Sequence, residues 1–150
     1  MSETVHEIAM GSDHAGFPLK EKIKDYLLKK GYSVNDYGTH SEEKTDYPDY
    51  IHPLSARVSA GEHPVGIIMC GSGNGASMTA NKYPGVRSAL CWSAVITRLA
   101  RQHNDANILA LPGRFIEEEL ALELVDIFLN TPFEGGRHLK RIQKITGNMQ

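Results

Sequence analysis

Cysteine is scarce in this sequence: Cys70 and Cys91 are the only two among 150 residues. Two cysteines are too few for a disulfide framework, and neither has a neighbour at the spacing of a zinc site. Long apolar runs are missing as well, since no stretch approaches the roughly 18 residues that a membrane-spanning helix needs. The N-terminal residues lack the basic and apolar regions of a signal peptide. We therefore expect a cytoplasmic protein without a membrane segment.

An excess of positive charge is also absent. Lys and Arg number 16 against 18 Asp and Glu, for a net charge of −2, and this balance excludes a generally basic nucleic-acid-binding protein. The 41% of hydrophobic residues is ordinary for a globular protein. Because a chain of 150 residues can bury one sizeable core, we expect a single domain over residues 1–150.

Short apolar runs alternate with amphipathic segments along the chain. Strand-like runs cover 6–11, 32–37, 65–70, 86–92 and 107–111, and the third is apolar throughout, as in a strand buried on both faces. Helical spacing covers 18–30, 93–103, 117–129 and about 136–146. Two more helices flank the third strand, and Pro53 leaves the start of the first of them open. This alternation predicts an open, parallel α/β sheet with helices on both faces.

The strongest local signal is the run Cys70-Gly71-Ser72-Gly73-Asn74-Gly75 after the third strand. Its glycines expose successive backbone N–H groups to an anion or to a developing oxyanion. A merely tight turn between strand and helix is the alternative. A dinucleotide site is a third interpretation, because Gly71, Gly73 and Ala76 match its loose fingerprint, but no acid stands about 20 residues further on to bind a ribose.

Three further groups stand where a side chain can reach a ligand. Open parallel sheets bind ligands at the carboxyl ends of their strands, and Asp13-His14 follows the first strand. Cys70 stands where the third strand meets the glycine turn, near a helix start that favours the thiolate, so it could act as a base or nucleophile. His103 closes the predicted fourth helix. For Cys91, which has no comparable position, we expect a buried side chain without a chemical role.

The C-terminal segment is basic. Arg137 and Arg141 are four residues apart and therefore lie on one face of the predicted helix, where two guanidinium groups suit a phosphate. A solvated basic face is the alternative at a chain end. No His-x-x-x-His or carboxylate-flanked pair suggests a metal ion, so we expect chemistry without a metal.

Six motifs together resemble one family over nearly the whole chain. They are Gly11-Ser12-Asp13-His14-Ala15-Gly16, Thr45-Asp46-Tyr47-Pro48, Cys70-Gly71-Ser72-Gly73-Asn74-Gly75, Ala80-Asn81-Lys82, Arg101-Gln102-His103-Asn104-Asp105 and Glu134-Gly135-Gly136-Arg137-His138. In order and spacing they are similar to ribose-5-phosphate isomerase type B, the family shared with the galactose-6-phosphate isomerase subunits. The resemblance implies a Rossmann-like three-layer α/β/α sandwich with a five-stranded parallel sheet, no cofactor, and a homodimer or dimer of dimers.

The resemblance also implies an activity and a role for each candidate residue. The activity is the interconversion of D-ribose 5-phosphate and D-ribulose 5-phosphate through an enediolate, in the pentose phosphate pathway. Cys70 matches the proton-abstracting base, and His103 matches the histidine that helps to open the furanose ring. Groups that hold sugar hydroxyls or relay protons are Asp13, His14, Tyr47, Ser72 and Asn104, with Ser72 counted as catalytic. Phosphate-side positions are Arg114, Arg137, His138 and Arg141, and Arg137 and Arg141 are expected to reach the neighbouring subunit's site. The amides of Gly71, Gly73, Asn74 and Gly75 would serve as oxyanion donors.

The sequence leaves the sugar open. A six-carbon substrate, allose or galactose 6-phosphate, requires the same chemistry, although a chain that carries every part of the site favours the pentose. Two hypotheses come from other functional classes. They are a nucleotide-binding module and an interaction module that uses the basic tail.

Overall fold

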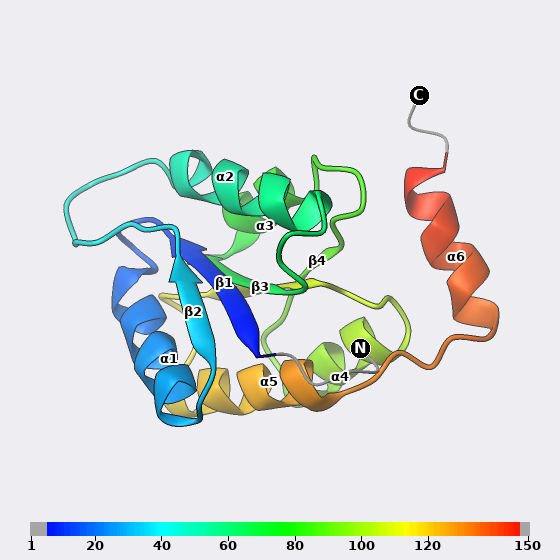
Figure 1. Ribbon diagram of the computed structural model, residues 1–150. Coiled ribbons are helices and arrows are strands. Elements are labelled where there is room, and N and C mark those ends of the chain that lie inside the picture. The colour runs from blue at the N-terminus through cyan, green and yellow to red at the C-terminus, as the bar shows by residue number, and fades with distance from the viewer. Residues whose placement is uncertain (1–5, 148–150) are drawn as a thin grey trace.

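The computed structural model of this chain describes residues 6–147. Within them, five strands form one sheet and six helices flank or extend it (Figure 1). The strands are β1 (Glu7–Ser12), β2 (Ser33–Asp36), β3 (Gly66–Cys70), β4 (Ser88–Leu90) and β5 (Ile108–Pro112). The helices are α1 (Phe17–Lys29), α2 (Tyr47–Ser59), α3 (Asn74–Ala80), α4 (Ala94–Gln102), α5 (Glu118–Asn130) and α6 (Arg137–Thr146). None of these helices is both long enough and apolar enough to cross a membrane.

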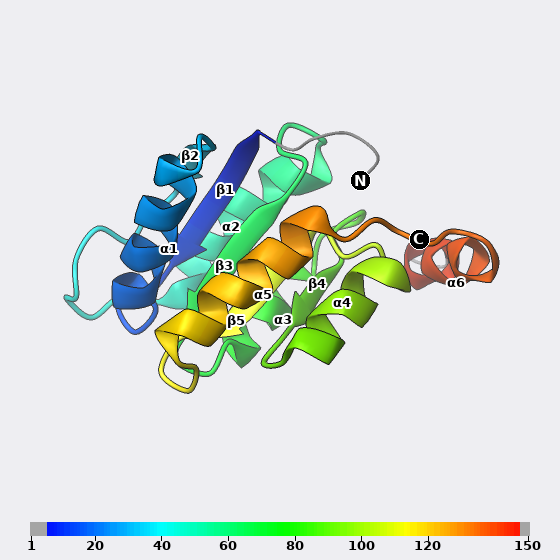
Figure 2. The same cartoon turned by 90° about the horizontal axis from the view of Figure 1, so that it is seen from below.

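Every strand pair is parallel, and the strand order is β2-β1-β3-β5-β4. Helices α1, α4 and α5 cover one face of the sheet, and α2 and α3 cover the other (Figures 1 and 2). The predicted three-layer sandwich is therefore confirmed. Side chains alternate along β3, so that Ile67 and Met69 pack with the first layer, and Ile68 and Cys70 pack with the second. Cys70 thus points toward α2 and α3.

The observed bounds differ from the predicted ones mainly at α2 and β4. Helix α2 begins at Tyr47, where Pro48 occupies the first turn and its missing N–H costs no hydrogen bond. Strand β4 is three residues long, shorter than the predicted 86–92. The Arg87 oxygen still accepts from the backbone N of Asn107 and of Ile108, but the Arg87 N–H donates to the side chain of Asn107 at 2.8 Å. The regular pairing with β5 therefore begins at Ser88.

A buried ion pair joins α1 to the end of β2. Lys20 is fully buried, and its Nζ lies 2.7 Å from Asp36 Oδ2, which also lies 3.1 Å from Lys24 Nζ. Burial raises the pKa of Asp36, but hydrogen bonds from Lys20, from the Gly38 N–H and from Lys24 outweigh it and leave the pKa below its ordinary value. The carboxylate therefore stabilises the fold above about pH 4, and this contribution is lost as the pH falls through the lowered pKa.

Removing this carboxylate should cost stability at neutral pH. We expect Asp36→Asn to lower the free energy of unfolding at pH 7 by about 3 kcal/mol, because the charged Lys20 then stays buried with only Glu21 as its partner. The stability of the variant should also fall less steeply than that of the wild type between about pH 4 and pH 2. Urea titrations at a series of pH values measure both effects.

A matched control is Asp25→Asn, which breaks an exposed pair with Lys29 on α1. It should change the free energy of unfolding by less than about 1 kcal/mol, as is usual for an exposed ion pair. Equal losses in the two variants would show that burial of the Lys20–Asp36 pair has no special importance.

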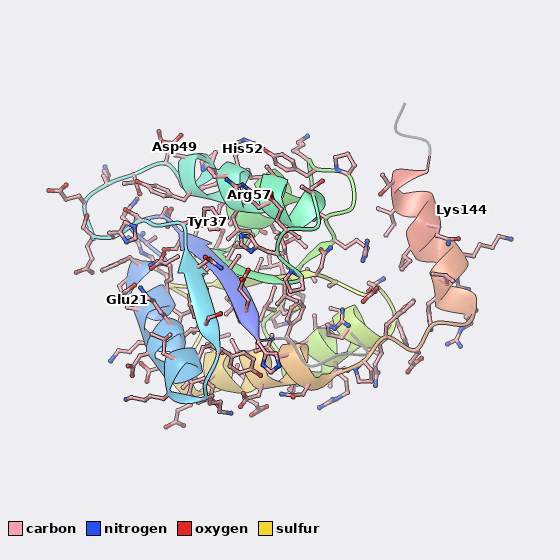
Figure 3. All side chains as sticks on the ribbon, in the orientation of Figure 1. Glu21, Tyr37, Asp49, His52, Arg57 and Lys144 are labelled. Atoms are coloured by element: carbon pink, nitrogen blue, oxygen red, sulfur yellow. The ribbon has the colours of Figure 1, made fainter. Side chains whose placement is uncertain are left out.

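Helix α6 stands apart from the layered body (Figures 1 and 2). His138 and Ile142 are buried, whereas Leu139 and Ile145 are 46% and 55% exposed. Lys144 extends away from the body (Figure 3). Two large, half-exposed apolar side chains on a projecting helix form a surface that another chain can cover.

Candidate active site

The strand order reverses between β1 and β3, and open α/β sheets bind ligands at the carboxyl ends of strands at such a point. Asp13 and His14 follow β1, and Cys70 ends β3. The two strand ends approach closely, because a Cβ on Gly16 would lie 2.7 Å from the backbone oxygen of Met69. Only glycine fits at that contact, and it holds the turn that carries Asp13 and His14 against the end of β3.

Residues 71–75 form a tight turn from β3 into α3. Gly73 has a φ of +82°, and a Cβ on it would lie 2.5 Å from Leu90 Cδ1, so the turn requires glycine here. The Ser72 hydroxyl accepts hydrogen bonds from the backbone N of Asn74 at 3.2 Å and from its Nδ2 at 3.1 Å. The turn therefore holds successive backbone N–H groups in a fixed arrangement at the strand end, where they can meet an anion.

Tyr47 covers this turn from α2. A Cβ on Gly75 would lie 2.3 Å from Tyr47 Cζ and 2.6 Å from Tyr47 Oη, so the ring lies directly against the glycine. Cys70 is 5% exposed and belongs to the core cluster against which Tyr47 packs. A thiol, a phenol hydroxyl and backbone N–H donors thus share one strand end. A base beside preorganised donors suits proton transfer at a carbon next to a carbonyl.

Two reciprocal hydrogen bonds fix His14. Its backbone N donates to Thr45 Oγ1, and the backbone N of Thr45 donates to His14 Nδ1, both at 3.1 Å. Because the accepting Nδ1 carries no hydrogen, the neutral ring has its N–H at Nε2. Sequence reasoning did not single out Thr45, whose only signal was its place in a family motif. A hollow of about 580 Å³ beside the ring is lined by His14, Lys44, Thr45, Asp46, Asp49 and Tyr50.

Asp13 and Arg114 border the same strand end from β1 and β5. Asp13 is buried, and its Oδ1 accepts a hydrogen bond from the Gly16 N–H at 3.0 Å. The backbone N of Arg114 donates to the Gly71 oxygen at 2.9 Å, which ties the residues after β5 to the glycine turn. The exposed Arg114 side chain adds a positive charge at this edge of the sheet.

The other candidates lie at the opposite edge of the sheet. His103 follows α4, shortly before β5 begins, and Asn104 comes next. The length of β5, about 13 Å for four residue steps, separates this edge from the strand end beside Cys70. The ring of His103 stacks on that of His138, with centroids 4.2 Å apart and planes 14° from parallel. The phosphate-side candidates on α6 belong to this second group: Arg137, His138 and Arg141.

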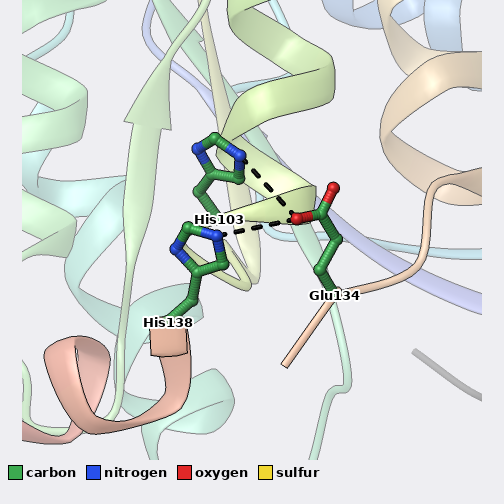
Figure 4. A group of neighbouring side chains, drawn as sticks. All are labelled: His103, Glu134 and His138. Atoms are coloured by element: carbon green, nitrogen blue, oxygen red, sulfur yellow. Dashed lines mark ion pairs between the residues drawn. The ribbon is translucent and has the colours of Figure 1, made fainter. Parts of the chain in front are cut away.

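Glu134 joins the two stacked histidines (Figure 4). Its Oε1 lies 3.6 Å from His138 Nε2 and 3.9 Å from His103 Nε2. Burial lowers the pKa of His138, and the positive charge of Arg137 lowers it further, so that its ring is neutral at pH 7. Sequence reasoning missed this cluster, because Glu134 and His138 are 31 or more residues from His103 along the chain.

The family model described as Ribose/Galactose Isomerase matches residues 8–145 of this chain. The chain belongs to that family. Among its relatives, ribose-5-phosphate isomerase B of Escherichia coli (strain K12) is 45% identical over 140 residues, which cover 93% of this chain and 94% of that protein. The resemblance that the sequence motifs indicated is therefore confirmed.

Solved structures agree with this assignment. The crystal structure of a ribose 5-phosphate isomerase from Thermotoga maritima is 54% identical, with a TM-score of 0.93, over 97% of this chain and 99% of that one. The structure of ribose-5-phosphate isomerase B from Mycoplasma genitalium holds bound ribulose-5-phosphate. It is 40% identical, with a TM-score of 0.91, over 95% of each chain.

Within this family member, the candidate residues form two groups rather than one. The first group, at the carboxyl edge of the sheet, contains Asp13, His14, Tyr47, Cys70, residues 71–75 and Arg114. The second group, at the opposite edge and on α6, contains His103, Asn104, Arg137, His138 and Arg141. Cys91 lies outside both. It is fully buried as expected, and burial raises its pKa to about 11, which keeps the thiol protonated at neutral pH.

Proposed function

We propose that this protein is an aldose–ketose isomerase that interconverts D-ribose 5-phosphate and D-ribulose 5-phosphate. In this proposal it works without a cofactor, in the cytoplasm, as part of the pentose phosphate pathway. The observation that carries the proposal is the position of Cys70 at the end of β3, beside the glycine turn and Tyr47. The likeness to the enzyme of Escherichia coli, and to the ribulose-5-phosphate complex of the Mycoplasma genitalium enzyme, supports the same reaction.

The reaction moves a proton between two neighbouring carbons of the open-chain sugar. The Cys70 thiolate takes the proton from C2 of the aldose, the C–H electron pair forms a C1=C2 double bond, and the C1 carbonyl oxygen becomes an oxyanion. The thiol then returns the proton to C1, and the C2 hydroxyl passes its proton to the C1 oxyanion. C1 thereby gains a hydroxyl, and C2 becomes the new carbonyl. A positioned base of this kind contributes about 10²–10⁴ to the rate.

The other groups at this edge hold the sugar and its developing charge. Backbone N–H groups of residues 71–75 stabilise the enediolate, except that of Asn74, which donates to the Ser72 hydroxyl. Each preorganised donor contributes about 3 kcal/mol to the transition state. The side chains of Asp13, His14, Tyr47 and Ser72 bind sugar hydroxyls or relay protons. Arg114 attracts the phosphate, whose binding energy is remote from the reacting carbons.

The second group acts in a neighbouring subunit. His103, which in this proposal opens the furanose ring, lies too far from Cys70 of its own chain to share a substrate with it. A two-fold symmetric dimer places the same surfaces of both chains opposite each other, so one chain's α6 and His103 can complete the other chain's site. The half-exposed Leu139 and Ile145 on α6 support such a contact. We therefore propose a homodimer, or a dimer of dimers, with sites shared between subunits.

A coupled assay with purified protein tests the reaction and the sugar together. We expect kcat/KM for ribose 5-phosphate to exceed that for allose 6-phosphate by about tenfold or more, because the site must discriminate an additional carbon and its hydroxyl. A reversed preference would assign the protein to a six-carbon sugar phosphate. Absence of turnover with both sugars, in protein with a cooperative thermal transition, would overturn the proposed function.

A further inference from the structure

The cluster of His103, Glu134 and His138 has the composition of a metal site (Figure 4). One ligating atom from each residue lies within 4.8 Å of the others. The geometry points to a site for a divalent cation of the zinc type, whose binding inhibits the enzyme by occupying His103. The claim that a cation binds rests on the cluster alone. The claim that the bound cation inhibits the enzyme rests on the proposed function.

An unsatisfied buried atom marks this site. His138 is 5% exposed, and its Nε2 is buried without a hydrogen-bond partner among the described residues. The nearest carboxylate oxygen, Glu134 Oε1, lies at 3.6 Å, which is too long for a hydrogen bond. A cation between the three residues would give this nitrogen the partner that it lacks.

The two separations between a histidine nitrogen and the Glu134 oxygen are close to those around a bound cation. Zinc–nitrogen and zinc–oxygen bonds of about 2.0–2.2 Å place tetrahedral ligand atoms about 3.3–3.5 Å apart. The separations of 3.6 and 3.9 Å exceed this by a few tenths of an ångström. Glu134 is exposed and can move inward, whereas the partly exposed His103 must tilt out of its stacked orientation to turn its nitrogen toward the ion.

The ligand set selects the class of cation. Two imidazoles and one carboxylate suit zinc and its transition-metal neighbours, whereas magnesium and calcium prefer oxygen ligands alone. Arg137 and Arg141 bring positive charge close to His138 and therefore oppose cation binding. Three ligands favour binding and two nearby positive charges oppose it, so the cation should be bound and released reversibly. Reversible binding is compatible with an enzyme whose chemistry needs no metal.

Inhibition follows from the chemistry of the imidazole. The nitrogen lone pair that coordinates a cation cannot accept a proton from the sugar hydroxyl during ring opening. His138 lies among the phosphate-side groups, so the bound cation also holds the start of α6 in one position. Zinc should therefore lower turnover reversibly, and dialysis against a chelator should leave the activity unchanged or raise it.

The test combines titration with activity. After dialysis against EDTA, calorimetry with zinc sulfate should give one site per chain in the wild type, and Co²⁺ should give visible d–d bands without a thiolate charge-transfer band. In Glu134→Gln the zinc affinity should fall by more than the roughly 10- to 100-fold that is typical of losing a residue that only supports a ligand. Relative to its own metal-free activity, the turnover of Glu134→Gln should resist zinc, whereas that of the wild type should fall.

Two further variants make the outcome decisive. Glu123→Gln changes an exposed glutamate on α5 outside the cluster and should bind zinc like the wild type. His103→Gln removes a ligand from a partly exposed side chain and should lose zinc binding even if Glu134→Gln does not fold. Equal zinc affinity in the wild type and both ligand variants, or a cobalt–thiolate band, would overturn the site. Because calorimetry needs no turnover, its result is independent of whether the proposed isomerase reaction is correct.

Discussion

Replacing Cys70 with alanine should lower kcat by about 10²–10⁴-fold, because the variant has no positioned base over the sugar carbon. The alanine keeps the small volume and apolar character that the cluster beneath Tyr47 requires, so the melting temperature should change little. Steady-state kinetics with ribose 5-phosphate, together with a thermal melt, measure both quantities. Binding of a non-reacting substrate analogue should also survive, since the phosphate-side and hydroxyl-binding groups remain.

The second cysteine provides the matched control. Cys91→Ala removes a buried thiol that is protonated at neutral pH and lies outside both groups of site residues, so turnover should be nearly unchanged. A thiol-alkylating reagent should inactivate the wild type, and bound substrate should slow this loss. If Cys70→Ala retains more than about a tenth of the wild-type turnover, another group is the base, because a general base is worth more than that.

Mixing two inactive variants should restore activity if each site takes its parts from two chains. We expect Cys70→Ala and His103→Ala to be nearly inactive when each is assayed alone. After subunit exchange, half of the dimers are mixed and each mixed dimer has one intact site, so about a quarter of the wild-type activity should return. An Arg137→Ala/Arg141→Ala variant in place of His103→Ala should behave similarly when substrate is well below KM. Each lost charge-assisted hydrogen bond weakens binding by about 10- to 100-fold.

A double variant supplies the control for this experiment. When Cys70→Ala is mixed with Cys70→Ala/His103→Ala, no dimer contains an intact site, and no activity should return. Native mass spectrometry of differently tagged chains confirms that exchange has occurred. Exchange without recovered activity in the first mixture would mean that Cys70 and His103 of one chain serve the same site, contrary to their positions on opposite edges of the sheet.

The arrangement of the first group could be predicted from the sequence because it depends on local rules. The wholly apolar run 65–70 predicts a strand buried on both faces, and β3 is the central strand of the sheet. Parallel strands bring their carboxyl ends to one edge, so Asp13, His14 and Cys70 are expected to lie together. The hydrogen bonds between His14 and Thr45 could be found only in the structure. They join two loops whose residues are 31 apart along the chain, and no sequence periodicity indicates such a contact.

The second group could not be placed in this way. The sequence indicated that α6 forms a helix and that Gly135 and Gly136 precede it, but the direction of a helix after such a joint depends on tertiary contacts. The stacking of His103 on His138 follows from that direction alone. Family resemblance assigned roles to both residues, yet it did not indicate that Glu134 would stand between them.

The separation of the two groups on opposite edges has a consequence for gene duplication. In a dimer with shared sites, each chain contributes the residues around Cys70 to one site and the residues around His103 to the other site. Two copies of the gene can then diverge, one losing the residues around Cys70 and the other losing those around His103, while their mixed dimer keeps one working site. Selection would afterwards retain both genes, because neither product forms a complete site with itself.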